Sequence, residues 1–386
     1  MNLKMVFAIL MGLNLGVIFM NIPPAMDGLM LLYGVSYTRI SILLSALLWS
    51  HALMQVPAGM MTDHFGTRRT LVASLLFMGL GNIVPAFLPS FELAILGRVA
   101  TGVGTGLSVA STMKMVALYA PGGRIGTYQA FFGGFFSLGS IVSYLLIPNL
   151  AASGWQWIYV LPGVLSFPLL AMIPALRLGP EMHGEFSSLH LGRILSHREG
   201  WLLGLCHALS FGSMLNLGNW VPSLMAEMSK EGMAVGFAWG GALVMFTSGV
   251  GRLSGGFFLM RYDSLKIVTG SMAILSVLFL GLFVIHSPVF ALGLALLASW
   301  FASINFGAIF HLAARATATD SYATLFGFIN FLANLGAILF TLMFGFMKDA
   351  TGSFTWGFFI LALLTLAAYT LSPSMNSGQA MSKDSG

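Results

Sequence analysis

Residues 59–69 read Gly-Met-Met-Thr-Asp-His-Phe-Gly-Thr-Arg-Arg. This stretch joins two long apolar runs and differs from both, because it contains Asp63, the turn-forming Gly66 and the adjacent cations Arg68 and Arg69. Glycine permits a tight turn, and basic residues at the end of an apolar run are typical of a cytoplasmic loop. We therefore expect a short basic loop between two membrane-spanning helices.

The composition of the whole chain is that of a polytopic membrane protein. Of its 386 residues, 57% are hydrophobic and 8% are charged, and the mean hydropathy is +0.89. Soluble domains have roughly 25% charged residues, with which they cover their surface. A water-soluble enzyme is therefore excluded. The single cysteine, Cys206, also excludes an intrachain disulfide and a thiolate metal cage.

Windows of about twenty apolar residues predict twelve membrane-spanning helices. In the first half of the chain we expect them near residues 5–24, 38–61, 70–89, 92–117, 125–150 and 155–176. In the second half we expect them near residues 200–226, 233–260, 266–286, 288–313, 321–346 and 353–372. The predicted fold class is all-α, with six-helix bundles at 1–177 and 200–372, a cytoplasmic linker at 178–199 and a disordered tail at 373–386.

Basic residues are distributed unequally between the two sides of the predicted membrane. With a cytoplasmic N-terminus, the even-numbered connections contain Arg68, Arg69, Arg124, Arg177, Arg193, Arg198, Arg261, Lys266 and Arg315. The odd-numbered connections contain only Arg39, Lys230 and Lys348. Because cytoplasmic loops carry the excess of Lys and Arg, both termini are predicted to be cytoplasmic. The net charge of +5 thus reflects topology and does not indicate a nucleic-acid partner.

The two halves of the chain come into register at a shift of 197 residues. This shift aligns residues 55–59 with 252–256, and Arg69 with Lys266. It also aligns Thr, Phe, Leu and Gly residues within 127–139 with identical residues within 324–336. Because one shift serves two distant helix pairs, we infer an internal duplication and two pseudo-symmetric bundles.

The loop at residues 59–69 has the form G-x-x-x-D-x-x-G-x-R-R, which resembles the signature loop of the major facilitator superfamily. A segment of the predicted fourth helix, from Arg98 to Gly104, is similar to the R-x-x-x-G-x-G segment of that family. The resemblance implies a secondary transporter in which two bundles alternate access to a midplane site. It implies neither an enzyme nor a cofactor, and we expect a functional monomer in a prokaryotic cytoplasmic membrane.

The resemblance also implies gating roles for loop residues. Gly59 would allow close contact between helices, Asp63 would pair with a cation or a helix N-terminus, and Gly66 would permit the turn. Arg68 and Arg69 would lie in the cytoplasmic interface. The second-half copy of the loop departs from the pattern, since Met260 stands where the acid would be. The predicted fifth helix lacks the Gly-Pro pair found in many drug antiporters of the family, which disfavours export of drugs.

Arg252 is charged and lies well inside a predicted helix. It precedes Arg261 by nine residues, which places its backbone roughly 13 Å from the cytoplasmic loop. A charge in hydrocarbon costs about 2.5 to 3.5 kcal/mol, so Arg252 is predicted to line an aqueous cavity and bind an anion. The alternative is a structural arginine that is bonded to carbonyls of neighbouring helices.

The run at residues 249–256 resembles the eighth helix of anion-transporting branches of the family, which include nitrate/nitrite porters and oxalate or monocarboxylate carriers. In those branches an arginine there contacts the substrate. Nitrate porters have a second arginine at the position aligned with Gln55, so nitrate specificity stays open. We predict transport of a small anion, nitrate, nitrite or a short carboxylate, by proton symport or anion exchange.

Further polar residues are expected along the same cavity. His51 and Gln55 are four residues apart and share a helix face, and His51 is the candidate for proton coupling because imidazole titrates near physiological pH. Helix packing is the alternative role for His51. Asn330 and Asn334 also share a face, with interhelical hydrogen bonding as their alternative. The remaining candidate substrate contacts are Asn21, Trp220 and Arg98, of which Arg98 has a structural role as its alternative.

Other functions have less support in the sequence. There is no nucleotide-binding G-x-x-x-x-G-K-[ST] loop, no zinc pattern and no hydrolase motif, so we expect no ATP drive by this chain, no catalysis and no metal. Two alternatives stay open: export of an amphipathic drug or metabolite through a Met- and Phe-rich cavity, and a membrane sensor that transports nothing. The expected partners are a small solute, the lipid bilayer and a coupling proton.

Overall fold

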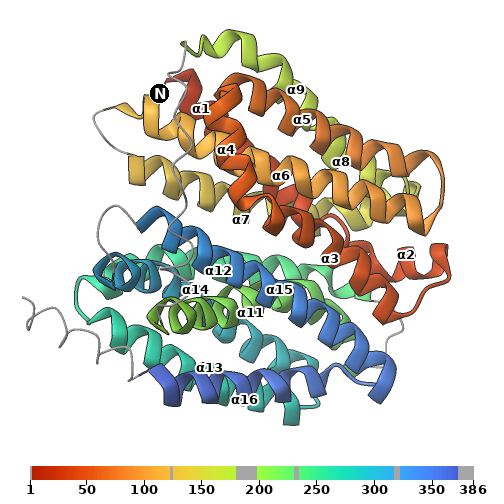
Figure 1. The fold of residues 1–386 in the computed structure, drawn as a ribbon. Coiled ribbons are helices and arrows are strands. Elements are labelled where there is room, and N and C mark those ends of the chain that lie inside the picture. The colour runs from red at the N-terminus through yellow and green to blue at the C-terminus, as the bar shows by residue number, and fades with distance from the viewer. Residues whose placement is uncertain (1, 122–124, 180–197, 230–233, 317–321, 373–386) are drawn as a thin grey trace, which may run out of the picture. The chain divides into compact units, whose positions relative to one another are not determined.

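The computed structural model describes residues 2–121, 125–179, 198–229, 234–316 and 322–372, and their regular structure is helical throughout (Figure 1). Contacts divide the chain into two compact units, Met1–Phe186 with Gly232–Phe246, and Ser187–Glu231 with Thr247–Gly386. Most of the expected linker and the whole of the expected tail lie outside the described residues. The predicted domain boundaries therefore stay predictions.

The first unit contains the helices from α1 to α9 and short 3-10 turns. The α-helices are α1 (Leu3–Phe19), α2 (Met26–Tyr33), α3 (Tyr37–Leu53), α4 (Gln55–Phe65), α5 (Thr67–Ile83), α6 (Phe91–Tyr119), α7 (Ile125–Ser153), α8 (Trp157–Val164) and α9 (Ser166–Met172). The 3-10 turns are η1 (Pro23–Ala25), η2 (Val84–Phe87) and η4 (Ile173–Leu176).

The second unit is built mainly from long helices. They are α11 (Arg198–Ser229), α12 (Ala238–Leu259), α13 (Ser264–Val284), α14 (Pro288–Ala316), α15 (Tyr322–Thr351) and α16 (Thr355–Leu371). The turn η5 (Ala234–Phe237) precedes α12, and the first residues of α12, up to Phe246, belong to the first unit by their contacts.

Among the described residues, nine helical segments are long and apolar enough to cross a membrane, or ten if the bent pair α3 and α4 forms one span. Of the other expected spans, α11 is 32 residues long, and α16 is apolar with 17 residues. Each of the twelve expected runs contains helix, so the all-α prediction is confirmed.

The first helix does not end where the sequence suggested. We expected one span near 5–24, whereas α1 ends at Phe19 and the apolar segment continues through η1 into α2, as far as Tyr33. Pro23 and Pro24 stand at the start of η1, where a missing N–H costs little, so the prolines interrupt the helix without ending the segment.

The second expected helix is bent. Instead of one helix near 38–61, α3 ends at Leu53 and α4 follows at a bend of 53°. Pro57 lies four residues after Leu53 and has no backbone N–H, so it cannot donate the hydrogen bond that the Leu53 carbonyl would accept in a continuous helix, and its ring clashes with that carbonyl. The bend thus falls between His51 and Gln55, the pair expected on one helix face.

Equivalent glycines lie at close helix crossings in the two units. A Cβ atom at Gly139 on α7 would overlap the Leu13 carbonyl of α1. A Cβ atom at Gly336 on α15 would lie 2.7 Å from the Ala208 Cβ atom of α11. Since the 197-residue shift aligns Gly139 with Gly336, both units use the same packing device, as an internal duplication predicts.

Candidate functional site

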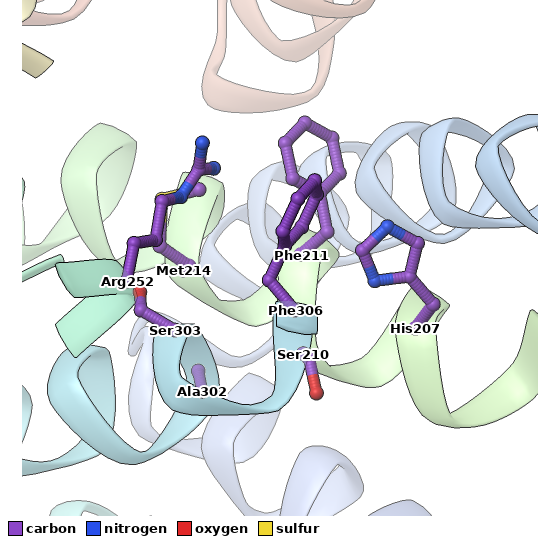
Figure 2. A pocket seen from close by; sticks show the side chains of 8 residues that line it. All are labelled: His207, Ser210, Phe211, Met214, Arg252, Ala302, Ser303 and Phe306. Carbon is purple, nitrogen blue, oxygen red and sulfur yellow. The ribbon is translucent and has the colours of Figure 1, made fainter. Parts of the chain in front are cut away.

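A small cavity in the second unit is the candidate binding site (Figure 2). Its volume is about 10 Å³, which is roughly enough for one water molecule. The α11 residues that line it are spaced three or four apart and therefore share one helix face. The lining consists of His207, Ser210, Phe211 and Met214 from α11, Arg252 from α12, and Ala302, Ser303 and Phe306 from α14.

Two glycines of α12 bring Arg252 to this cavity. A Cβ atom at Gly251 would lie 2.8 Å from the Trp300 carbonyl oxygen, and one at Gly255 would lie 2.8 Å from the Ile304 carbonyl oxygen. The four-residue spacing of these small residues lets the α12 backbone approach α14 closely. Arg252 is therefore held against α14, where it reaches the ring of Phe306.

The guanidinium of Arg252 has no ionic partner in the described part of the chain. No carboxylate lies within 4.0 Å of it there, and no hydrogen-bond acceptor is recorded for it among those residues. Its Cζ atom lies 5.3 Å from the centroid of the Phe306 ring, a cation–π contact. The alternative of an arginine bonded to backbone carbonyls is thus not what this structure shows.

His207 is a cavity residue that the sequence analysis did not identify. It lies on α11, which begins nine residues earlier, at Arg198, and its side chain is only 2% exposed. Its Nδ1 atom is buried without a hydrogen-bond partner among the described residues. The imidazole lies 5.6 Å from the Phe306 ring and 5.1 Å from the Phe310 ring, centroid to centroid. His207 lies about two helical turns after residue 200, where the expected span begins, so its burial could have been predicted from the sequence.

The two asparagines expected at the site lie on α15. Asn330 donates from Nδ2 to the Phe326 carbonyl at 3.1 Å, and its side chain faces His207. Asn334 donates to the Asn330 carbonyl at 2.9 Å, while its buried Oδ1 atom has no partner in the described part of the chain. Of the two, Asn330 is the one that the structure brings close to the cavity residue His207.

His51 and Gln55 interact in the first unit. The Gln55 amide nitrogen lies 2.8 Å from His51 Nε2, and His51 Nδ1 lies 3.0 Å from the Thr105 hydroxyl. The Thr105 hydroxyl donates to the Gly102 carbonyl at 2.9 Å. An amide N–H can only donate, so Nε2 accepts and Nδ1 donates, which corresponds to a neutral imidazole. The proton-coupling role of His51 stays a prediction.

Arg98 and Asn21 join helices of the first unit. Arg98 is 2% exposed and donates from Nη1 to the Ile18 carbonyl at 3.0 Å and to Asn21 Oδ1 at 2.9 Å. Asn21 donates to the Ile158 carbonyl at 2.9 Å. These bonds tie α6 to the end of α1 and to α8, and they favour the structural role over the predicted contact with a solute.

Trp220 was predicted to contact the substrate, and its buried position does not agree with that role. The side chain is fully buried and donates from Nε1 to Asn216 Oδ1 at 3.2 Å. Its ring lies 5.2 Å from the ring of Phe354 and 6.4 Å from that of Phe344. Trp220 is therefore part of the aromatic core of the second unit, where it packs against Phe344 of α15 and Phe354, which directly precedes α16.

The basic loop contains one expected interaction with an unexpected partner. Asp63 pairs with a cation, Lys114 of α6, at 2.9 Å, and the Lys114 ammonium also donates to the Thr62 carbonyl at 3.3 Å. Gly66 has a φ of +83° and forms the turn between α4 and α5.

The other loop residues are open to their surroundings. Arg68 and Arg69 are exposed, and nothing among the described residues lies within 4 Å of a Cβ atom placed at Gly59. The close helix contact predicted at Gly59 is therefore not found among the described residues. The gating roles of all five loop residues stay predictions.

Comparisons with known proteins agree with this architecture. Residues 5–341 match the Major Facilitator Superfamily. The chain is 30% identical over 162 residues to the "Probable galactarate/D-glucarate transporter" of Escherichia coli (strain K12), a match that covers 40% of this chain and 36% of that protein. It is 31% identical over 170 residues to the "Multidrug resistance protein B homolog" of Mycobacterium tuberculosis (strain CDC 1551 / Oshkosh), with coverages of 43% and 32%. The chain thus spans about a third of the length of these relatives.

A solved structure shows the same fold. The crystal structure of a D-xylose-proton symporter superposes with a TM-score of 0.78 at 15% identity. The superposition covers 95% of this chain and 96% of that one.

Proposed function

The chain belongs to the Major Facilitator Superfamily, and from this premise we propose that it is a secondary transporter that moves a small anion across the membrane by alternating access. The cargo is nitrate, nitrite or a short carboxylate, and it binds at Arg252. Coupling is by proton symport or anion exchange. The protein acts as a monomer in a prokaryotic cytoplasmic membrane, with both termini in the cytoplasm.

The unpaired guanidinium of Arg252 carries this proposal. A permanent charge at membrane depth is costly, and in this chain no described carboxylate balances it. The guanidinium fork matches the planar geometry of carboxylates and oxyanions and binds them through two parallel hydrogen bonds. An anion that binds there would supply the missing countercharge. It would also accept hydrogen bonds from the guanidinium N–H groups of Arg252, which lie over the Phe306 ring.

A relative adds support for an anionic cargo. The galactarate/D-glucarate transporter is named for sugar acids, which are carboxylates. The symporter in the matching crystal structure is named for a coupling proton. Neither name assigns a substrate to this chain, but both are compatible with proton-coupled movement of an acid.

Uptake into proteoliposomes tests the role of Arg252. We expect Arg252→Ala to abolish uptake of labelled nitrate or acetate, because no other described cation lines the cavity. Arg252→Lys should recover little, since an ammonium cannot form the two parallel bonds of the fork. Arg315→Ala is the matched control, because that side chain is about half exposed and lies near Asp263. Full uptake by the folded Arg252→Ala protein would sink the proposal.

Export of an amphipathic drug is the second candidate function. The multidrug-resistance relative and the aromatic lining of the cavity favour it. A thermal-shift screen of the purified protein against small anions and lipophilic cations separates the two. Stabilisation by cations that does not depend on Arg252 would favour export, and stabilisation by anions that is lost in Arg252→Ala would favour anion transport.

A further inference from the structure

The cavity around Arg252 offers a solute few free polar groups. Two hydroxyls line it, and each already has one partner: Ser303 donates to the Ser248 hydroxyl at 2.9 Å, and Ser210 accepts from Asn305 Nδ2 at 3.0 Å. Among the polar groups of the lining, the guanidinium of Arg252 and Nδ1 of His207 have no hydrogen-bond partner in the described part of the chain. A solute in this cavity therefore meets one charged donor group and one imidazole nitrogen.

An aromatic surface separates these two groups. The Phe306 ring lies between the Arg252 side chain and the His207 imidazole (Figure 2), with centroid distances of 5.3 Å to Arg252 Cζ and 5.6 Å to the imidazole. Phe211 from α11 also lines the cavity, and its ring lies 6.1 Å from the imidazole. Along the cavity a solute would thus meet a cation, then a flat apolar surface, and then an imidazole nitrogen that can form a hydrogen bond.

We propose that this cavity, taken as the anion site of the proposed transporter, selects an aromatic monocarboxylate that has a hydroxyl group at the end opposite its carboxylate. The carboxylate binds the Arg252 guanidinium, and the solute ring packs on Phe306. The distal hydroxyl bonds to Nδ1 of His207, which can donate or accept depending on its tautomer. This assignment rests on the anion-transport function, and among the proposed anions it favours a carboxylate, specified here as an aromatic one, over nitrate and nitrite.

Binding requires a side chain to move. The empty cavity holds about one water molecule, and His207 is only 2% exposed. Phe306 is 37% exposed, so its ring has space to turn aside and admit the solute ring. Phe306 is therefore the residue whose rotation opens the path from Arg252 to His207.

The same chemistry disfavours two other kinds of anion. A polyhydroxylated sugar acid needs many hydrogen-bond partners, whereas the cavity has only two hydroxyls in its lining, and each already has one partner. Nitrate can occupy the guanidinium, but it is too small to reach His207 as well, so the buried nitrogen would stay without a partner.

Ligand competition on the intact wild-type protein tests the proposal directly. In proteoliposomes, 4-hydroxybenzoate should inhibit uptake of labelled benzoate roughly 3- to 10-fold more strongly than 4-methylbenzoate, which has nearly the same shape but no hydroxyl, as expected for one net hydrogen bond. D-glucarate and nitrate should inhibit more weakly than either. Equal inhibition by 4-hydroxybenzoate and 4-methylbenzoate, or stronger inhibition by D-glucarate or nitrate, overturns the proposal.

Variants then locate the hydroxyl contact. His207→Phe should remove the preference for 4-hydroxybenzoate over 4-methylbenzoate. His207→Asn, which retains a hydrogen-bonding group, should retain part of the preference. The exposed His286 gives the matched control, because His286→Phe should retain the full preference. A folded His207→Phe protein with an unchanged preference overturns the proposal.

The failure of this inference can be told apart from failure of the proposed function. If the aromatic acids do not bind but uptake of nitrate or acetate is lost in Arg252→Ala, the aromatic assignment is wrong and anion transport stands. If uptake of no anion depends on Arg252, both are wrong.

Discussion

His51, the residue that the sequence suggested for proton coupling, has a hydrogen-bond partner at each of its two ring nitrogens. Gln55 donates to its Nε2 atom, and its Nδ1 atom donates to Thr105, so both ring nitrogens are already used. Adding a proton at Nε2 would set two donors against each other, unless the Gln55 amide turned to present its oxygen. A proton on His51 is therefore linked to a rearrangement of Gln55.

If His51 carries the coupling proton, His51→Asn should affect proton-driven accumulation and anion exchange differently. The variant should lose accumulation of the anion that is driven by an inward proton gradient, because the titratable group is gone, yet it should retain exchange of internal for external anion. The measurement compares both modes in the same proteoliposomes. Thr105→Ser, which preserves the hydroxyl, should retain both modes. Gradient-driven accumulation at the wild-type level in His51→Asn would exclude His51 as the coupling group.

At the level of helices, packing in each unit depends on glycines that remove side-chain volume at a crossing. The best example with a matched control is on α15, where Gly336 faces α11 and Gly327 faces open space. A Cβ atom at Gly336 would lie 2.9 Å from the Ala208 carbonyl oxygen as well as close to its Cβ atom, so the helices would have to separate.

Gly336→Ala should therefore destabilise the protein by about 1 to 3 kcal/mol, the usual range for overpacking. Gly327→Ala should be neutral or stabilising, because alanine favours helix over glycine by about 1 kcal/mol and meets no neighbour there. Thermal unfolding of the two purified variants in the same detergent provides the comparison. A lower melting temperature for Gly327→Ala than for Gly336→Ala would contradict the packing argument.

At the scale of the whole molecule, the distribution of basic loops predicts the orientation in the membrane. The only cysteine, Cys206, is 1% exposed, so the wild-type chain should be nearly silent to thiol reagents. Asn2 and Ser153 are exposed and lie at opposite ends of predicted spans, on the cytoplasmic and outer sides respectively.

In spheroplasts, a membrane-impermeant maleimide should label Ser153→Cys directly. It should label Asn2→Cys only after the membrane has been permeabilised. The readout is the mass shift of the purified protein, with the wild-type chain as the blank. The reverse pattern would mean that the chain is inserted the other way round.

The sequence alone predicted that the chain lies in a membrane, and it predicted the fold class, the duplication and the family. These properties follow from the low charge, the apolar runs and the repeated glycines, all of which can be read along the chain without coordinates. The sequence also identified Arg252, since a lone charge in an apolar run is visible without coordinates. It could not show that Pro57 bends the second span, that Lys114 is the partner of Asp63, or that Trp220 is enclosed by the core. The convergence of Arg252, Phe306 and His207 was decided only by the tertiary structure, because the close approach of α12 to α14 and the turn of α11 that faces them depend on packing between helices far apart in the chain.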